Sequence, residues 1–197
     1  MTEISNVSSY FGRLSETIEN LPVATINQIA ETLLRSYEDG RMIYLFGNGG
    51  SAALASHFAC DLGKGTANGT GKRFRVLALT DNVPLMTAWS NDSTYEDVFA
   101  EQLANFVQRD DVAFAISGSG NSPNVLRALR LAHEAGAITV GLTGYQGGKM
   151  KELCDQCMIV PSDNMQIIED LHLCAAHALF TAVRRGIFQR SAAAFAD

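Results

Sequence analysis

The stretch YLFGNGGSAALASHFACDL, residues 44–62, decides the fold class because a glycine turn joins an apolar run to a helical segment. The apolar run Met42–Phe46 ends at the turn GNGGS, residues 47–51. The alanine-rich segment that follows carries His57 and Asp61 four residues apart, so both side chains point to one face of a helix. A buried strand, a glycine turn and a helix in this order are typical of a parallel α/β sheet.

The alternation of strands and helices continues along the chain. The expected strands are Met42–Phe46, Phe74–Leu79, Val112–Ile116, Ile138–Leu142 and Met158–Val160. The expected helices around them are Ser51–Leu62, Leu85–Ser90, Asp97–Val107, Pro123–Ala135, Lys149–Leu153 and Asp163–Arg185. The sequence therefore predicts an α/β fold: a single, doubly wound, parallel five-stranded sheet. We expect one domain over residues 1–197, with two N-terminal helices at about 5–39 and an α/β core at about 41–185.

The composition excludes several classes of protein. The chain has 197 residues, of which 47% are hydrophobic and 18% charged, as in ordinary soluble domains. A net charge of −6 without a basic stripe argues against a nucleic-acid partner. No apolar run approaches the roughly 20 residues that span a bilayer, and the N-terminus does not read as a signal peptide, so we expect no membrane partner.

The cysteines are expected to be reduced thiols in a cytoplasmic protein. They are Cys60, Cys154, Cys157 and Cys174. Cys154 and Cys157 form a C-x-x-C pair just before the last predicted strand. A zinc site would need further ligands at compatible spacing, and a redox motif would normally begin a helix after a strand.

Three glycine-rich turns each follow a predicted strand and precede a helix. They are GNGGS at 47–51, SGSGNS at 117–122 and TGYQGG at 143–148. Ligands of such folds gather at the carboxyl ends of the strands, and backbone N–H groups at a helix start favour an anion. The second turn adds four donor side chains, Ser117, Ser119, Asn121 and Ser122. Because neither G-x-x-x-x-G-K-[ST] nor G-x-G-x-x-G is present, we expect a single phosphate on a small molecule rather than a nucleotide.

Titratable residues on two predicted helices could lie at the same edge of the sheet as these turns. The spacing of His57 and Asp61 suits two metal ligands or a carboxylate that orients an imidazole, although it is also common in surface contacts. On the last helix, Glu169 and His177 are eight residues apart, so their directions differ by about 80°. The neighbours that spacing alone does not separate from them are Asp170 and His172. A polar helix edge without function remains the alternative interpretation.

Several motifs together resemble the sugar isomerase (SIS) domain family, and more narrowly its phosphoheptose isomerase branch. The motifs are GNGGSAA…SHF from residue 47, AISGSGNSPNVLRAL at 115–129, SNDSTYEDVF at 90–99, LTGYQGGKM at 142–150 and IIEDLHLCAAH at 167–177. The resemblance covers nearly the whole chain. It implies a flavodoxin-like fold, a homotetramer with active sites between subunits, and conversion of sedoheptulose 7-phosphate to D-glycero-D-manno-heptose 7-phosphate for cell-envelope or glycan precursors.

The resemblance also implies roles for individual residues. The phosphate would lie on Ser117, Gly118, Ser119 and Ser122. The other substrate contacts would be Asn48, Gly49, Gly50, Ser51, Asn91, Asp92 and Glu169. A zinc ion would be held by His57, Asp61, Glu169 and His177. The catalytic groups would be Asp61, Glu169 and His177.

The chain departs from the family pattern at three of these positions. The family usually has Glu where this chain has Asp61, Gln where it has Glu169, and Ser-Thr-Ser where it has Ser-Gly-Ser around Gly118. A base at Asp61 would lie roughly 1.5 Å further back, and about 1 Å of misplacement can cost on the order of a hundredfold in rate. The exchange is either compensated by Glu169 or indicates another sugar phosphate.

An aldose–ketose isomerisation needs a base, an acid and stabilisation of an enediolate. Asp61 or Glu169 could be the base, His177 the acid and zinc the electrophile, and no organic cofactor is required. The alternative function is a non-catalytic SIS protein that binds a phosphosugar or a partner, such as the DnaA-binding replication-initiation proteins. A binding-only protein has no reason to keep two histidines and two carboxylates, which favours the enzyme.

Overall fold

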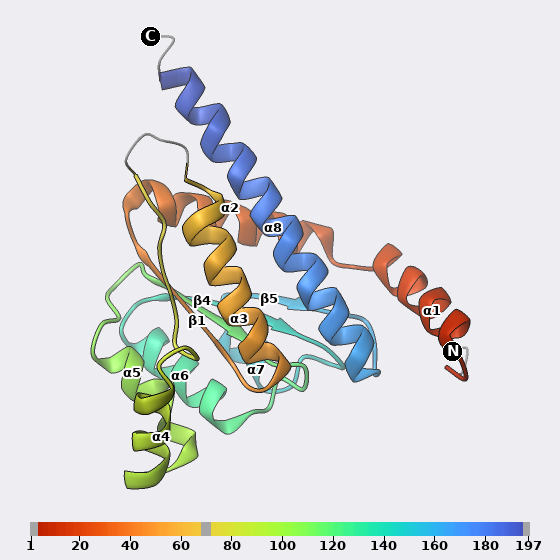
Figure 1. Ribbon diagram of the computed structural model, residues 1–197, viewed down its shortest axis with the longest axis horizontal. Coiled ribbons are helices and arrows are strands. Elements are labelled where there is room, and N and C mark those ends of the chain that lie inside the picture. Colours follow the sequence, from red (N-terminus) through yellow and green to blue (C-terminus); the bar gives the residue numbers. More distant parts are fainter. Residues whose placement is uncertain (1–3, 68–71, 195–197) are drawn as a thin grey trace.

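The computed structural model describes residues 4–67 and 72–194 and arranges them around a parallel sheet (Figure 1). The strands are β1 Met42–Gly47, β2 Arg75–Ala78, β3 Val112–Ile116, β4 Ile138–Thr143 and β5 Gln156–Ile159. Their order is β2-β1-β3-β4-β5, and every pairing is parallel. The carboxyl ends of all five strands therefore lie along one edge of the sheet, which confirms the predicted fold class.

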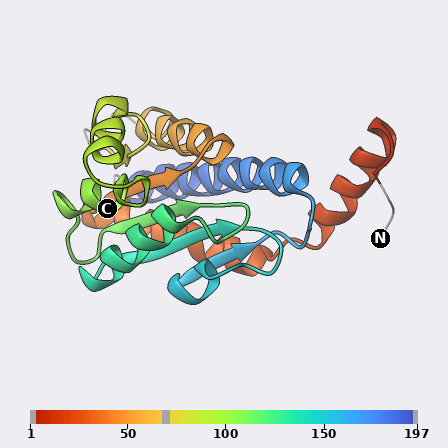
Figure 2. The ribbon, with the colours of Figure 1, turned by 90° about the horizontal axis from the view of Figure 1, so that it is seen from below.

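Helices cover both faces of the sheet (Figure 2). The helices are α1 Val7–Glu19, α2 Val23–Asp39, α3 Gly50–Cys60, α4 Val83–Asp92, α5 Ala100–Ala104, α6 Pro123–Glu134, α7 Met150–Leu153 and α8 Met165–Ala194. One buried apolar cluster joins the sheet to α2, α3 and α8, and a second joins it to α5, α6 and α7. Successive residues of β1 belong to alternate clusters: Ile43 and Leu45 to the first, Tyr44 and Phe46 to the second. Burial on both faces explains why the strand is a continuous apolar run.

The last helix extends past its predicted end at Arg185, so that boundary is corrected. α8 continues through Gly186 to Ala194. A Cβ atom at Gly186 would lie 2.8 Å from Leu34 Cδ2 of α2. This glycine therefore serves a close contact between two helices instead of ending one.

The predicted helix over residues 97–107 is also wrong in extent. A 3₁₀ turn, Tyr95–Asp97, comes first, and α5 covers only five residues. The buried Asp97 carboxylate accepts hydrogen bonds from the hydroxyls of Ser93 and Thr94 and lies 2.6 Å from Arg127 Nη1. Side-chain bonds of this kind compete with a regular helix. The other predicted elements shift at their ends, and the expected single domain over 1–197 stays a prediction.

Helix α1 stands away from the body of the molecule in both ribbon views (Figures 1 and 2). Its hydroxyl-bearing Tyr10 donates a 2.6 Å hydrogen bond to Asp170 of α8. Its large apolar side chains Val7, Phe11 and Ile18 are exposed. Among the helices of the described part of the chain, none is both long enough and apolar enough to span a bilayer.

Candidate active site

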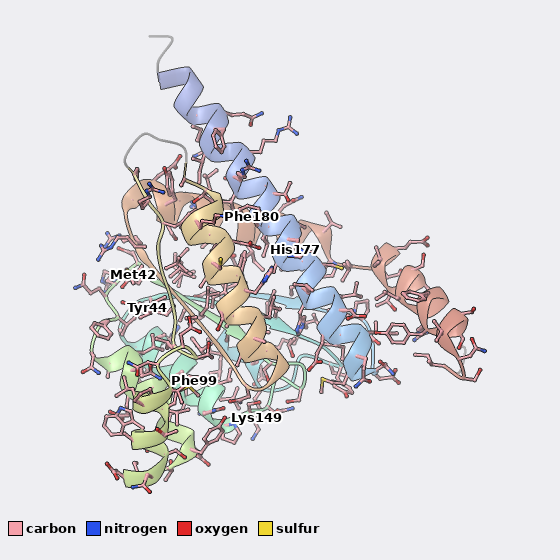
Figure 3. The ribbon with its side chains drawn as sticks, viewed as in Figure 1. Met42, Tyr44, Phe99, Lys149, His177 and Phe180 are labelled. Atoms are coloured by element: carbon pink, nitrogen blue, oxygen red, sulfur yellow. The ribbon has the colours of Figure 1, made fainter. Side chains whose placement is uncertain are left out.

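Three residues predicted as metal ligands meet between α3 and α8. His57 Nε2 lies 2.9 Å from His177 Nε2, and Asp61 Oδ2 lies 3.4 Å from the first and 3.9 Å from the second. Figure 3 shows His177 and Phe180 on the part of α8 that runs beside α3. The helices thus bring together side chains that are 120 residues apart in the sequence.

Asp61 lies where the regular helix ends. The prediction extended the α-helix to Leu62, but α3 ends at Cys60 and a π-helical turn covers Asp61–Gly65. Gly65 ends this turn against α8, because a Cβ atom there would lie 2.6 Å from Phe180 Cζ. The aromatic ring three residues after His177 therefore packs into the π turn that begins with Asp61. Such turns often occur at functional sites.

The three side chains fit a divalent metal. Two ligands of a tetrahedral zinc ion lie about 3.3 Å apart when each is about 2.0–2.1 Å from the metal. The measured separations of 2.9, 3.4 and 3.9 Å bracket that value. Two imidazole nitrogens and one carboxylate oxygen are also donors that zinc accepts, and about half of each imidazole is exposed to solvent.

Glu169 is close by but lies outside this group of three. It lines a cavity of about 370 Å³ together with His57 and His177. A Cβ atom at Gly50 would lie 3.3 and 3.4 Å from its two carboxylate oxygens. Because Gly50 begins α3, the carboxylate approaches a helix N-terminus, where the helix dipole favours negative charge. The glycine of the first turn therefore leaves room for an acidic group from α8.

The serine-rich turn is held in place by the third glycine turn. Ser117 Oγ and Ser122 Oγ are 3.2 Å apart, and the Ser122 side chain makes no capping hydrogen bond to α6. Gly120 has a φ of +63°, and a Cβ atom there would lie 2.2 Å from the Gly147 carbonyl oxygen. Only glycine fits both the backbone conformation and this contact. Met165 Sδ lies 2.4 Å from where a Cβ of Gly118 would be, so it fills the space next to that residue.

The comparisons with known proteins agree with this architecture. The SIS domain family model matches residues 8–144. A phosphoheptose isomerase of Bradyrhizobium sp. (strain ORS 278) is 35% identical over 190 residues, which cover 94% of this chain and 96% of the relative. One from Aneurinibacillus thermoaerophilus is 40% identical over 171 residues, with 83% and 82% covered. The chain belongs to the SIS domain family, in its phosphoheptose isomerase branch.

A solved structure supports the same assignment. The phosphoheptose isomerase from Neisseria gonorrhoeae superposes with a TM-score of 0.83 at 32% identity, covering 90% of this chain and 96% of that one. The family resemblance read from the motifs is therefore confirmed. The roles of individual site residues stay predictions, and they rest on the geometry of this chain.

Only some of the other residues predicted to contact the sugar line the cavity. Gly50 and Ser51 line the cavity, whereas Asn91 and Asp92, at the exposed end of α4, do not. Asn91 Nδ2 instead donates to Asp92 Oδ1 at 2.7 Å. Gly49, with a φ of +56°, is the N-cap of α3. Their roles as sugar contacts stay predictions.

Asn48 is tied to a residue that the sequence did not single out. Its amide and the amide of Asn124 exchange two hydrogen bonds of 2.9 Å, and Tyr95 donates to Asn48 Oδ1 at 2.8 Å. Asn124 is buried although it lies in an otherwise apolar helix start. In the sequence, the signal for this link between the first and second turns was Asn124, a polar residue two positions after Ser122.

Asp170 and His172 have different environments in the structure, although their spacing in the sequence did not distinguish them as site residues. Asp170 accepts the Tyr10 hydrogen bond; burial and this bond raise the pKa of Tyr10 to about 12. His172 lines the same cavity but is fully buried, and in the described part of the chain neither ring nitrogen has a partner of hydrogen-bond geometry. Burial lowers the pKa of His172 to about 4, against the opposing effect of the Thr143 backbone. The imidazole is therefore neutral at neutral pH.

This burial predicts a loss of stability in mild acid. The unfolded chain binds a proton at His172 near pH 6.5, whereas the folded chain binds it only near pH 4. The contribution of His172 to the free energy of unfolding is fully present above pH 6.5, and it falls as the pH drops toward about 4. Between pH 7.5 and pH 5 we expect this residue to cost about 2 kcal/mol of unfolding free energy, measured by urea titration.

The matched variants are His172→Gln and His133→Gln. The first should remove about 2 kcal/mol of the difference between the two pH values. The second, at the exposed His133, should leave the difference as in the wild type. Equal acid sensitivity of the wild type and His172→Gln would contradict the assignment.

Proposed function

We propose that this chain converts sedoheptulose 7-phosphate to D-glycero-D-manno-heptose 7-phosphate through an enediolate. The observation that carries the proposal is the cluster of His57, Asp61 and His177 between α3 and α8, whose two histidines line a cavity that also reaches Gly50 at the start of α3. The relatives are named phosphoheptose isomerases, which supports an isomerase over a non-catalytic SIS protein. Other sugar phosphates are the remaining alternative for the substrate.

The serine-rich turn would hold the phosphate. The hydroxyls of Ser117 and Ser122 converge at 3.2 Å, and the N-terminus of α6 follows directly. Hydroxyl donors and a helix start both favour a phosphate dianion. Binding the phosphate fixes one end of the sugar and presents the reacting carbons to the cavity beside α3 and α8.

Asp61 and His177 would move the protons. The base removes a proton from C1 of the ketose and returns it to C2, while a second proton passes between the oxygens of these carbons. The two groups must therefore reach adjacent substrate atoms. Asp61 Oδ2 lies 3.9 Å from His177 Nε2, which is close enough for one to serve carbon and the other oxygen. Glu169 lies apart from this pair, beside Gly50, and would contact the substrate instead.

The same group of residues would hold a zinc ion, and because an atom that binds the ion does not also transfer a proton, Asp61 would then act through its free carboxylate oxygen. His57, Asp61 and His177 would supply three ligands, whereas Glu169, the fourth ligand that the family resemblance implies, lines the same cavity but lies outside this group. When bound, the ion would supply positive charge that stabilises the charge developing on the reacting sugar. Zinc as the cofactor and the cytoplasm as the location are predictions that rest on the family resemblance and on the sequence.

The first prediction from the proposed function tests the activity and the base. Wild-type protein should form the aldose from sedoheptulose 7-phosphate, followed by a coupled aldehyde assay. Asp61→Asn should lower kcat at least about a hundredfold, because it removes the proton acceptor. Glu169→Gln should stay within about tenfold of the wild type, since the family usually has glutamine there. The reverse order of the two variants would move the base to Glu169.

A second prediction concerns the metal. His57→Ala should reduce the zinc content of protein purified without chelators and should lower isomerase activity with it. His133→Ala, at an exposed position of α6, should change neither quantity. A chelator should abolish activity, and added zinc should restore it. Full activity of a metal-free wild type would exclude the zinc site.

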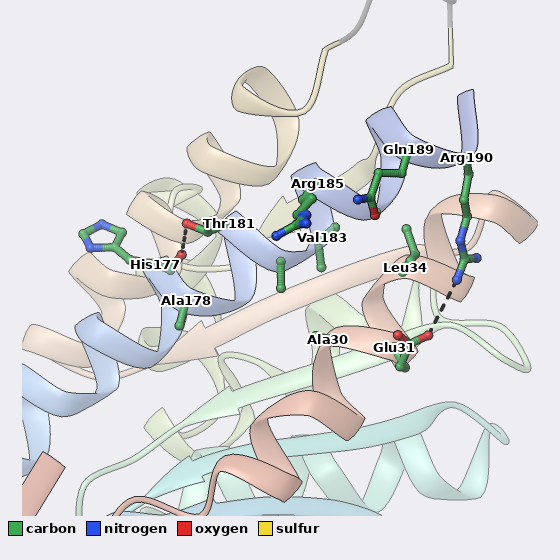
Figure 4. A pocket seen from close by; sticks show the side chains of 12 residues that line it. Ala30, Glu31, Leu34, His177, Ala178, Thr181, Val183, Arg185, Gln189 and Arg190 are labelled. Carbon is green, nitrogen blue, oxygen red and sulfur yellow. Dashed lines mark hydrogen bonds and ion pairs between the residues drawn. The ribbon is translucent and has the colours of Figure 1, made fainter. Parts of the chain in front are cut away.

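The oligomer would cover surfaces that one chain leaves open. The exposed fractions of Val7, Phe11 and Ile18 on α1 are 72%, 61% and 45%. A groove of about 700 Å³ runs between α2 and α8, with His177 at one end and Arg190 at the other (Figure 4). We therefore propose that further copies of this chain pack on α1 and along this groove, beside the active site, to form a homotetramer.

The tetramer predicts a mass of about 85 kDa, four times 21.2 kDa, in size-exclusion chromatography with light scattering. Phe11→Ser should lower that mass at micromolar concentration, because it removes apolar contact from α1. Phe106→Ser, at a similarly exposed phenylalanine just after α5, should leave the mass unchanged. A wild-type monomer at this concentration would contradict the proposal.

A further inference from the structure

The C-x-x-C pair, to which the proposed isomerase assigns no role, forms a compact thiol site. Cys154 caps the C-terminus of α7, and Cys157 lies in β5 opposite Gly141 of β4. A Cβ atom at Gly141 would lie 2.9 Å from Cys154 Sγ and 3.3 Å from Cys157 Sγ. The glycine thus leaves a space that both sulfur atoms share.

The two thiols interact and differ in acidity. Both residues are half-buried, and both sulfur atoms lie next to Gly141. The neighbouring Cys154 side chain lowers the pKa of Cys157, as does the charge of Lys151, while burial opposes the shift. The Cys157 side chain and burial raise the pKa of Cys154. Cys157 is therefore the thiol that would react first.

A short chain of hydrogen bonds connects this pair to the serine-rich turn. The Cys154 N–H donates to the Met150 carbonyl at 3.1 Å, across the whole of the four-residue helix α7. At the other end of α7, the Met150 N–H donates to the Gly120 carbonyl at 3.0 Å, and the Lys149 N–H donates to Asn121 Oδ1 at 3.1 Å. Displacement of Cys154 therefore moves groups that hold the turn.

We propose that Cys154 and Cys157 are a dithiol modification site that a low-molecular-mass disulfide oxidises to an intramolecular disulfide. We further infer that this oxidation loosens the turn at 117–122 and weakens phosphosugar binding, a step that rests on the proposed function of the turn. The loosening follows because an S–S bond of about 2.05 Å draws the end of α7 toward β5, away from its hydrogen-bonded position.

The reaction balances without any other reactant. The Cys157 thiolate attacks one sulfur of the small disulfide, whose S–S bond breaks and releases one small thiolate. Cys154 then loses its proton, and its sulfur attacks Cys157 Sγ and displaces the second small thiolate. The two cysteines lose two electrons, and the small disulfide becomes two thiols that take up the protons.

The test uses the full chain with Cys60→Ser and Cys174→Ser, because both of these cysteines are exposed and would react independently. The protein is incubated with oxidised glutathione and then freed of it. Intact-mass analysis should show the loss of two hydrogens, and residues 154 and 157 should resist alkylation until a reductant is added. Variants that also carry Cys154→Ser or Cys157→Ser should not form this product.

Two further measurements follow the turn. Hydrogen exchange of the backbone amides at 117–122 should be faster in the oxidised protein than in the reduced protein. Calorimetry with sedoheptulose 7-phosphate should show roughly tenfold weaker binding, within the usual range of coupling between two sites. Both changes should reverse on reduction.

The outcomes are distinguishable. A product that stays a mixed disulfide with glutathione, or remains unmodified, overturns the modification site. A disulfide that changes neither exchange at 117–122 nor phosphosugar affinity overturns the coupling. Faster exchange at the turn in a protein that binds no phosphosugar in either state supports the thiol site and its coupling, and contradicts the proposed function instead.

Discussion

The close approach of α8 to α3 is the constraint on which the candidate site depends. Two glycines lie where the helices approach: Gly50 next to the Glu169 carboxylate, and Gly65 against the Phe180 ring. With these contacts in place, His177 comes within hydrogen-bond distance of His57. A side chain at Gly65 would meet the Phe180 ring, because its Cβ would lie 2.6 Å from Cζ, whereas at Gly50 the nearest atoms belong to the flexible end of Glu169.

The phosphate end of the proposed site depends on another close contact. Gly120 and Gly147 bring the second and third turns together, and α7 is bonded to the second turn through its first backbone N–H groups. The turn therefore does not stand alone as a loop. Because α7 connects the turn to the region of β4 and β5, a change at the thiol pair there would also affect the turn.

The exchanged carboxylates have a structural explanation. Asp61, shorter than the glutamate usual in the family, begins a π-helical turn and still reaches both imidazoles. Glu169, where the family usually has the neutral glutamine, lies next to Gly50 at the N-terminus of α3. Each departure is thus accommodated by its backbone surroundings, so the exchange does not by itself argue for another reaction.

The sequence determined the order of strands and helices, because continuous apolar runs and glycine turns are local signals that survive in any packing. It also predicted that His57 and Asp61 share one helix face, since they are four residues apart. Spacing alone did not decide which residues of α8 join them: the motif resemblance named Glu169 and His177, and the structure brings only His177 into the group. Spacing could not separate Glu169, Asp170 and His172, whereas packing bonds Asp170 to Tyr10 and buries His172. The length of α8 and the π turn at Asp61 likewise involve contacts at Gly186 and Gly65. Whether a glycine ends a helix or allows a close contact depends on the residue packed against it, and here that residue is distant in the sequence.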